Sequence, residues 1–304
     1  MKLKVAALTL AVVAFTTCAP APKEKKALGV DKTNFETTIN GKETKLYTLK
    51  NKNGMEVQLS NYGGRILSIQ VPDAKGEMAD VLLGFNTLKE YETNEYNAVV
   101  GPYANRIANG QFSIGDATYQ LSTADNGNCL HNGAIGFKHS MFDATQQGNT
   151  VEMTINSPDG EFGFPGNKIV KVTYTLTDDN ALKIDYKATT DAACPFNLTN
   201  HAYFNLKGEG NGDILGHVMY IDADSTTTID SELIPTGEIV SIKGGDLDFT
   251  TPTVIGKRIN SDSDFIKLGM GYDHNFILNK NQNDHEMTLA ARVEEPTSGR
   301  VLEV

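Results

Sequence analysis

The segment from residue 194 to residue 206 (CPFNLTNHAYFNL) carries the densest group of side chains that could do chemistry. Read as a β-strand, it places Asn197, Thr199, His201, Tyr203 and Asn205 on one face, because alternate residues of a strand point to the same side. This row donates and accepts hydrogen bonds but carries no formal charge. Such a surface suits a polyol such as a sugar, whose hydroxyl groups must be hydrogen-bonded wherever they leave water.

His201 is the candidate proton-transfer group of this row. Because free histidine titrates near pH ~6.5, an imidazole can both donate and accept a proton at neutral pH. The alternative is a structural histidine whose nitrogens are satisfied by neighbouring groups.

Three other places combine polar side chains with turn-rich sequence. Asn105 and Arg106 lie in GPYANRIANG (101–110), His131 lies in NGNCLHNG (126–133), and Asp273 opens a predicted strand within 271–278. Each is a weak signal by itself, since exposed arginines are normally solvated, loop histidines are often incidental, and Asp273 could form an Asx turn. No HxH or HExxH spacing links the histidines, so the pattern gives no support to a catalytic metal.

The elements that must position these residues are strands and turns. Period-two alternation predicts strands at residues 47–49, 57–59, 66–71, 151–155, 169–176 and 182–186. Six Asn-Gly pairs, from Asn40-Gly41 to Asn211-Gly212, are hairpin signals. With one turn near residues 87–93 as the only helical candidate, the sequence predicts an all-β fold, a large antiparallel β-sandwich.

Composition limits the class of partner. The 304 residues include 27 Lys and Arg against 38 Asp and Glu, a formal charge of -11, which repels phosphate backbones and argues against a nucleic-acid partner. A neutral or cationic small ligand fits this charge better. We expect a monomer.

The N-terminus predicts export. Residues 1–17 join a basic start to an apolar run that is too short to span a bilayer, as in a signal peptide. Cys18 stands where a bacterial lipoprotein is cleaved and lipidated, although Phe15 and Thr17 depart from the usual lipobox, and residues 18–33 resemble a flexible tether. We expect a periplasmic or outer-membrane-attached lipoprotein of a Gram-negative bacterium, touching the membrane through its lipid alone. The alternative is an ordinary signal peptide with release into the periplasm.

The remaining cysteines and the C-terminus carry further predictions. Cys129 and Cys194 could form a disulfide in an oxidising compartment, but nothing in the sequence brings them together, and two small apolar residues are the simpler interpretation. Residues 34–304 are predicted to form one domain. The last residues enter a strand pattern at Arg300 and stop without a closing turn, which suggests a truncated version of a longer protein.

Taken together, the motifs resemble one family, the aldose 1-epimerases or galactose mutarotases. The resemblance runs from about Asn34 to Val304 and rests on six motifs in order. These are GPYANRIANG (101–110), NCLHNG (128–133), DGEFGFPGN (159–167), NLTNHAYFNL (197–206), LIPTGE (233–238) and YDHNF (272–276).

The resemblance implies a β-sandwich with a sugar site and interconversion of the α and β anomers of hexoses such as glucose and galactose. It implies that His201 is the acid that protonates the ring oxygen. Sugar hydroxyls would be held by Asn105, Arg106, His131, Tyr203 and Asp273. No cofactor is required for this chemistry, and while some relatives can hold Ca²⁺, no local motif here predicts it.

The sequence departs from the family pattern in two places. The resemblance implies that the general base is a glutamate in a motif beyond the strand that begins at Arg300, and we expect that glutamate to be absent from this chain. Glu303 does not match that motif, and we expect Glu303 to lie on the last strand. Phe142 stands where the family often has tryptophan. The alternatives to an epimerase are therefore a carbohydrate-binding lipoprotein without turnover and an unstable fragment without function. The sequence does not indicate the preferred aldose.

Overall fold

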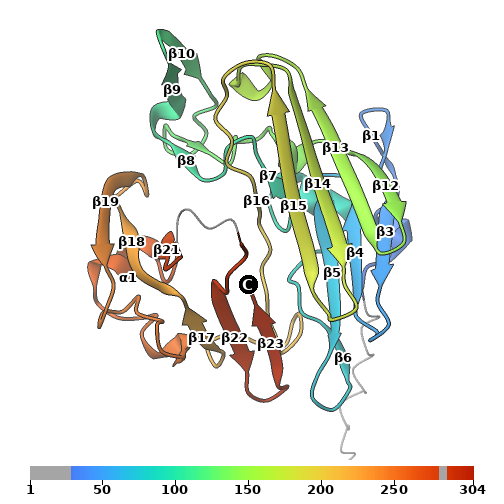
Figure 1. Cartoon of the computed structure of the whole chain (residues 1–304), viewed down its shortest axis with the longest axis vertical. Helices are drawn as coiled ribbons and strands as arrows, with labels where there is room; N and C mark the ends of the chain where they lie inside the picture. The colour runs from blue at the N-terminus through green and yellow to red at the C-terminus, as the bar shows by residue number, and fades with distance from the viewer. Residues whose placement is uncertain (1–28, 281–285) are drawn as a thin grey trace, which may run out of the picture.

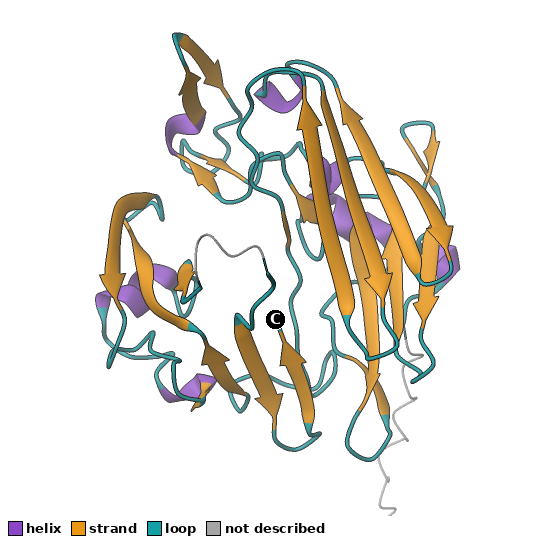
Figure 2. Cartoon of the chain, in the orientation of Figure 1, coloured by secondary structure: helices purple, strands orange, loops and turns teal. Residues whose placement is uncertain are grey.

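The computed structural model describes residues 29–280 and 286–304, and its strands form two packed sheets and two further sheets beside them (Figures 1 and 2). The first packed sheet has the order β3 (Leu46–Lys50), β4 (Glu56–Ser60), β5 (Arg65–Pro72) and β6 (Met78–Asp80). The second has the order β12 (Asp143–Gln147), β13 (Thr150–Ser157), β14 (Lys168–Leu176) and β15 (Leu182–Thr190). Neighbouring strands in both are antiparallel.

Alternating side chains hold the two sheets together. Along β14, Val170, Val172 and Tyr174 are buried, while the residues between them are more exposed. They pack with Val57 and Leu59 of β4 in one hydrophobic core. Strands with one apolar and one polar face must bury the apolar face against another layer, which gives a sandwich.

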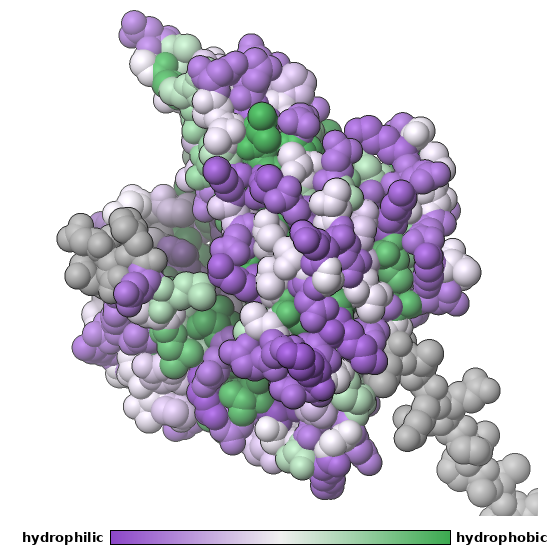
Figure 3. Space-filling view, turned by 45° about the vertical axis from the view of Figure 1, so that its right-hand side comes forward, coloured by the Kyte–Doolittle hydropathy of each residue, from purple (hydrophilic) through white to green (hydrophobic). Residues whose placement is uncertain are grey.

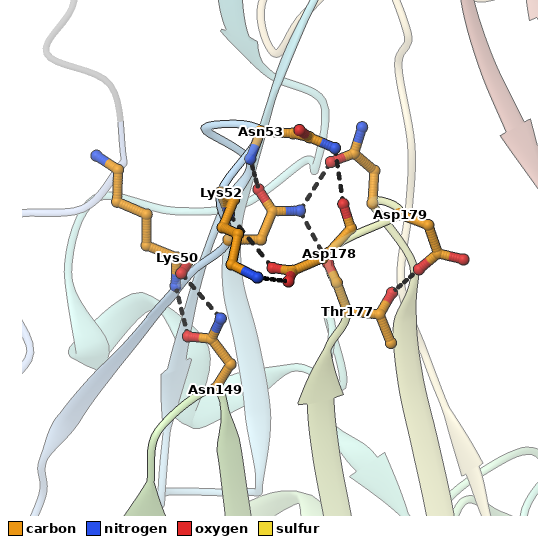
Figure 4. Close-up of polar contacts among 9 residues, drawn as sticks. Lys50, Lys52, Asn53, Asn149, Thr177, Asp178 and Asp179 are labelled. Carbon is orange, nitrogen blue, oxygen red and sulfur yellow. Dashed lines mark hydrogen bonds and ion pairs between the residues drawn. The ribbon is translucent and has the colours of Figure 1, made fainter.

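Turn-to-turn contacts lock the sheets at one end (Figure 4). The side-chain nitrogen of Asn51 donates to the carbonyl of Thr177 at 2.9 Å, and Lys52 forms an ion pair with Asp178 at 2.6 Å. Asn149 binds the backbone of Lys50 in both directions. These bonds fix the registration of the first sheet on the second.

The C-terminal half forms two further sheets. One has the order β20 (Thr253–Val254), β17 (Val218–Ile221), β22 (Ala291–Glu295) and β23 (Arg300–Glu303). The other has the order β19 (Pro235–Ser241), β18 (Ala223–Ile229) and β21 (Phe276–Leu278), and the short helix α1 (Asp264–Gly269) lies near it (Figure 1).

Short strand pairs and 3₁₀ turns connect these parts. The pairs are β1 (Thr38–Ile39) with β2 (Lys42–Glu43), β7 (Val99–Val100) with β16 (Thr199–Asn200), β8 (Arg106–Ile107) with β11 (Cys129–Leu130), and β9 (Gln111–Ile114) with β10 (Ala117–Gln120). The 3₁₀ turns are η1 (Lys32–Asn34), η2 (Leu88–Thr93), η3 (Ala108–Gly110), η4 (Phe137–His139), η5 (Glu161–Gly163) and η6 (Ile255–Lys257).

Most predicted elements are confirmed. The six predicted strands lie within β3, β4, β5, β13, β14 and β15, and the turn near residues 87–93 is η2, with a capping box between Thr87 and Glu90. The strand predicted over 194–206 is wrong in extent, since only Thr199–Asn200 pairs as a strand. The turns differ too: Asn40 and Gly41 both have positive φ between two strands, whereas Asn132-Gly133 follows β11 without closing a hairpin of the large sheets.

Several predictions lie wholly or mainly outside the described residues, among them the signal peptide 1–17, lipidation at Cys18 and most of the tether 18–33. Within the described ranges no helix is long and apolar enough to cross a membrane. On the face shown in Figure 3, hydrophilic side chains predominate and apolar ones form small scattered patches.

Candidate functional site

His201 and Tyr203 lie just after β16, where the chain is held by the segment that precedes β7. The amide of Asn97 donates to the His201 carbonyl at 2.8 Å, and the His201 amide donates to Ala98 at 3.0 Å. The Asn97 side chain accepts from the amide of Tyr203 at 3.3 Å. The backbone on both sides of the candidate acid is therefore fixed, although the segment is not a regular strand.

The structure brings three of the predicted aromatic site residues together. The ring centroids of His131 and His201 are 5.1 Å apart with perpendicular planes, although the residues are 70 positions apart in the sequence. The His201 and Tyr203 rings are also 5.1 Å apart. Tyr96, which no motif singled out, stacks on Tyr203 at 4.4 Å.

Asn105 fixes the orientation and protonation of His131. Its amide donates to Nδ1 of His131 at 2.9 Å, and the His131 amide donates to the Asn105 carbonyl at 3.1 Å. Because Nδ1 accepts a backbone hydrogen bond, the neutral imidazole carries its proton on Nε2. Both residues have positive φ, 67° and 52°, and asparagine and histidine are among the non-glycine residues that tolerate this region best.

Arg106 is held beside this pair by an acidic side chain. Its Nε donates to Asp125 at 2.8 Å, and the two side chains are 14% and 27% exposed. Asp125 precedes Asn126 and Gly127, which have positive φ in the tight turn bridged by Asp125 and Asn128. An open pocket of about 520 Å³ adjoins Arg106, with Tyr103, Phe112 and half-buried Cys194 in its lining.

Asp273 reaches the site from the C-terminal half. It is an exposed residue before β21. Burial is the main cause that raises the pKa of the Tyr203 phenol, and the charge of Asp273 makes a smaller contribution in the same direction. His274, the next residue, instead packs against Phe265 of α1 with ring centroids 5.8 Å apart. The predicted site residues thus gather around His201, while His274 belongs to a different cluster.

Burial and charge set the protonation of the site. Burial is the largest cause that lowers the pKa of His131 to about 4, and smaller electrostatic effects of neighbouring groups contribute to that value. His131 is therefore neutral at pH 7 and acts as a hydrogen-bond donor through Nε2. Burial is also the main cause that raises the pKa of Tyr203, which keeps its hydroxyl protonated.

Arg65 supports the loop that carries Tyr96. Its side chain is fully buried, and its two terminal nitrogens donate to the carbonyls of Tyr96, Tyr91, Asn94 and Lys138 at 2.5 to 3.0 Å. Lys138 also forms an ion pair with Glu95 at 3.6 Å. Burial lowers the pKa of Arg65 to about 10, so the guanidinium stays charged at neutral pH.

Other predictions for individual residues have clear outcomes. Cys129 and Cys194 are free, and both pack in or against one small apolar cluster. Phe142 is buried in the main core, and Glu303 lies on β23, where it pairs with Arg292 at 3.3 Å. Asn205, predicted in the polar row, is buried and binds the carbonyl of Gly212.

Among the described residues, no group of three or more His, Cys, Asp or Glu side chains could hold a metal ion. The prediction that no metal takes part and the expectation of Ca²⁺ in some relatives both stay untested. What the arrangement offers chemically is two adjacent imidazoles, a protonated phenol, a guanidinium and a carboxylate. These groups can exchange protons and bind hydroxyl groups.

Comparisons with known proteins show the family to which the chain belongs. The aldose 1-epimerase family model matches residues 45–304. The galactose mutarotase of Sus scrofa is 40% identical over 252 residues, which cover 82% of this chain and 71% of that protein. The aldose 1-epimerase of Escherichia coli (strain K12) is 38% identical over 78% of this chain and 69% of its own length.

Solved structures give the same result. An aldose epimerase homologue from C. elegans superimposes with a TM-score of 0.77 and 26% identity over 86% of this chain and 78% of that one. The galactose 1-epimerase of Lactobacillus acidophilus NCFM gives 0.75 and 29%, covering 85% and 75%. On the strength of these matches, this chain belongs to the aldose 1-epimerase family.

Proposed function

We propose that this chain is an isomerase of carbohydrate metabolism that interconverts the α and β anomers of aldohexoses such as glucose and galactose. The observation that carries the proposal is the 5.1 Å approach of His131 and His201, from loops far apart in a chain of this family. Family membership supplies the reaction class, and the site supplies groups that suit it.

Mutarotation moves protons without changing any oxidation state. A base removes the proton from the anomeric hydroxyl while an acid protonates the ring oxygen, and the bond between C1 and the ring oxygen breaks. Rotation about the C1–C2 bond then presents the other face of the aldehyde, and closure reverses the two proton transfers. Because proton transfer suffices, the chemistry requires no redox cofactor.

We assign His201 the role of acid at the ring oxygen, and Asn105, Arg106, His131, Tyr203 and Asp273 the role of hydroxyl contacts. In support, the neutral His131 offers an N–H donor, Arg106 offers charged donors, and exposed Asp273 offers acceptors. A hydroxyl group is both donor and acceptor, so it can be held between such groups.

One observation favours a second candidate, a carbohydrate-binding protein without turnover. The base must be a group free to take a proton, yet Asp125 and Glu95 are each paired with a cation, Arg106 and Lys138. The exposed carboxylate of Asp273 is already assigned to a sugar hydroxyl. We assign the base to none of the described side chains. Binding and turnover therefore have to be measured separately.

Polarimetry of freshly dissolved α-D-glucose and α-D-galactose tests the proposal, with His201→Ala beside the unchanged chain. Faster approach to equilibrium that disappears in His201→Ala supports the epimerase. Saturable sugar binding by calorimetry without acceleration supports the binding protein. A folded chain that neither binds nor accelerates contradicts both.

We further propose that the chain is exported and anchored by lipid at Cys18, on the strength of the N-terminal pattern alone. Expression of the 304-residue chain in a Gram-negative host tests this. The unchanged chain should fractionate with membranes, and Cys18→Ser should shift it to the soluble periplasmic fraction. Equal fractionation of the two would contradict lipidation at Cys18.

A further inference from the structure

The C-terminal half of the chain contacts the rest of the molecule through hydrogen bonds in two places. At one end, Arg300 donates to the carbonyls of Leu206 and Glu77 at 3.0 and 2.8 Å. Near Arg106, the side-chain nitrogen of Asn128 donates to a carboxylate oxygen of Glu232 at 2.9 Å. This second bond joins residues 104 positions apart and connects the loop before β11 to the tip of the β18–β19 hairpin.

The hairpin tip presents the Glu232 carboxylate in a fixed way. The side chain of Asp230 accepts the amides of Glu232 and Ile234 at 2.8 and 3.0 Å, and Leu233 between them has a φ of 63°. Glu232 itself is exposed. Its position is therefore set by the turn rather than by packing of its own side chain.

The turn that carries Asn128, the donor of this bond, is also fixed by hydrogen bonds. Asn128 is 3% exposed, and its side-chain oxygen accepts the amide of Asn109 at 2.9 Å. Its backbone and that of Asp125 bond to each other in both directions, at 3.1 and 2.7 Å. Since Asp125 also holds Arg106, the Glu232 carboxylate reaches the same small turn that positions a proposed sugar contact.

The hairpin is coupled in turn to Asp273. Strand β18 pairs with β19 on one side and with β21 on the other. The carbonyl of Asn275, two residues after Asp273, accepts bonds from the Thr226 hydroxyl at 2.8 Å and the Thr227 amide at 3.2 Å. A movement of the β18–β19 hairpin would therefore carry Asp273 with it.

We propose that the bond between Glu232 and Asn128 is a latch that holds the β18–β19 hairpin against the Arg106 loop, and that Glu232 thereby positions Asp273 for the sugar. Glu232 is a positioning residue and touches no sugar itself. The role in sugar binding rests on the function proposed above, whereas the latch itself does not.

The latch should act on affinity. A carboxylate acceptor makes a charge-assisted bond, which is stronger than a neutral one. If the site binds sugar only when latched, the apparent dissociation constant rises in inverse proportion to the latched fraction. Loss of one such bond at a partly exposed place should raise KM by about 3- to 10-fold, with kcat within about 2-fold.

The main variant is Glu232→Ala, which removes an exposed side chain and should leave folding intact. Glu238→Ala is the matched control, because it removes another exposed carboxylate of the same hairpin. The Glu238 carboxylate makes no hydrogen bond or ion pair with another described residue. Glu232→Gln should fall between Glu232→Ala and the unchanged chain, since its amide oxygen still accepts a neutral hydrogen bond.

Hydrogen exchange without sugar tests the latch independently of activity. Peptides spanning residues 125–133 and 228–236 should exchange faster in Glu232→Ala and remain unchanged in Glu238→Ala. Unchanged exchange in Glu232→Ala would overturn the latch, even if the chain proves inactive. Polarimetry then tests the positioning role in a chain that turns sugar over.

A double-mutant cycle with Asp273→Ala decides whether Glu232 works through Asp273. Coupled residues give non-additive free energies, so adding Glu232→Ala to Asp273→Ala should raise KM by much less than 3-fold. Fully additive effects on KM, or an effect of Glu232→Ala on kcat with KM unchanged, would overturn the positioning role while leaving the proposed function standing.

Discussion

The hydrogen bond from the Asn105 amide to Nδ1 of His131 makes a matched pair of substitutions informative. In His131→Asn, the side-chain oxygen can take the place of Nδ1 and keep that bond, but nothing replaces the N–H at Nε2. In His131→Gln, the amide nitrogen reaches the place of Nε2 and keeps a donor, but the Asn105 amide loses its acceptor. The two variants therefore measure separately the effect of the N–H donor at Nε2, which is proposed to face the sugar, and the effect of the acceptor at Nδ1, which binds the Asn105 amide.

The expected sizes follow from single hydrogen bonds. One neutral hydrogen bond contributes about 0.5–1.5 kcal/mol, so His131→Asn should raise KM by about 2- to 13-fold while the unfolding free energy changes little. His131→Gln should lower the unfolding free energy by about 0.5–1.5 kcal/mol and leave KM within about 2-fold.

Initial rates by polarimetry give KM, and urea unfolding gives the free energy. Nitrogen NMR of the unchanged chain should also show a neutral His131 with its proton on Nε2 from pH 5 to 8, since its pKa lies at about 4. The reverse result, in which His131→Gln raises KM and His131→Asn lowers the unfolding free energy, would refute the assigned tautomer and its contact with the sugar.

Three further predictions concern stability and charge. Replacing buried Arg65 by Met leaves four backbone carbonyls without its donors and should lower the unfolding free energy in urea by about 3–5 kcal/mol; a loss under ~1 kcal/mol would contradict this. Burial lowers the pKa of His131 and His139 to about 4, so between pH ~6.5 and 4 the unfolded chain binds more protons than the folded chain. The unfolding free energy should therefore fall as the pH falls through this range, by at most ~1.4 kcal/mol per pH unit for each histidine. Above pH ~6.5 these two groups should contribute no slope, and His131→Asn should reduce the slope below it. Asp125→Asn should free Arg106 and raise KM for galactose, whereas an unchanged KM would show that the ion pair does not orient it.

The sheets of the sandwich were predictable because apolar and polar residues alternate along their strands. Val170, Val172 and Tyr174 repeat every second residue, and burial follows that period in the structure. The sequence from 194 to 206 shows a similar alternation but pairs as a strand only at Thr199–Asn200. Around His201 and Tyr203 its hydrogen bonds go to Asn97 and Ala98, and elsewhere they go to other segments, such as Pro102 and Val81. No local pattern encodes these contacts.

The candidate site was predictable only through motifs. His131 and His201 carry a signal in their own segments, but their approach depends on the fold. Tyr96 carried no signal, because an aromatic residue in a loop is usually part of a core. Asp125 could have been found from its place directly before the Asn126-Gly127 turn, whereas the bond of Glu232 to Asn128 spans 104 residues and could not.

The central claim is that His201 transfers a proton during anomer interconversion. Two-dimensional exchange NMR of glucose at anomeric equilibrium tests it most directly, because cross-peaks between the α and β H1 signals report turnover without any net reaction. We predict such cross-peaks with the unchanged chain, growing with its concentration, and none above the sugar alone with folded His201→Gln. Equal exchange with both chains would contradict the role of His201.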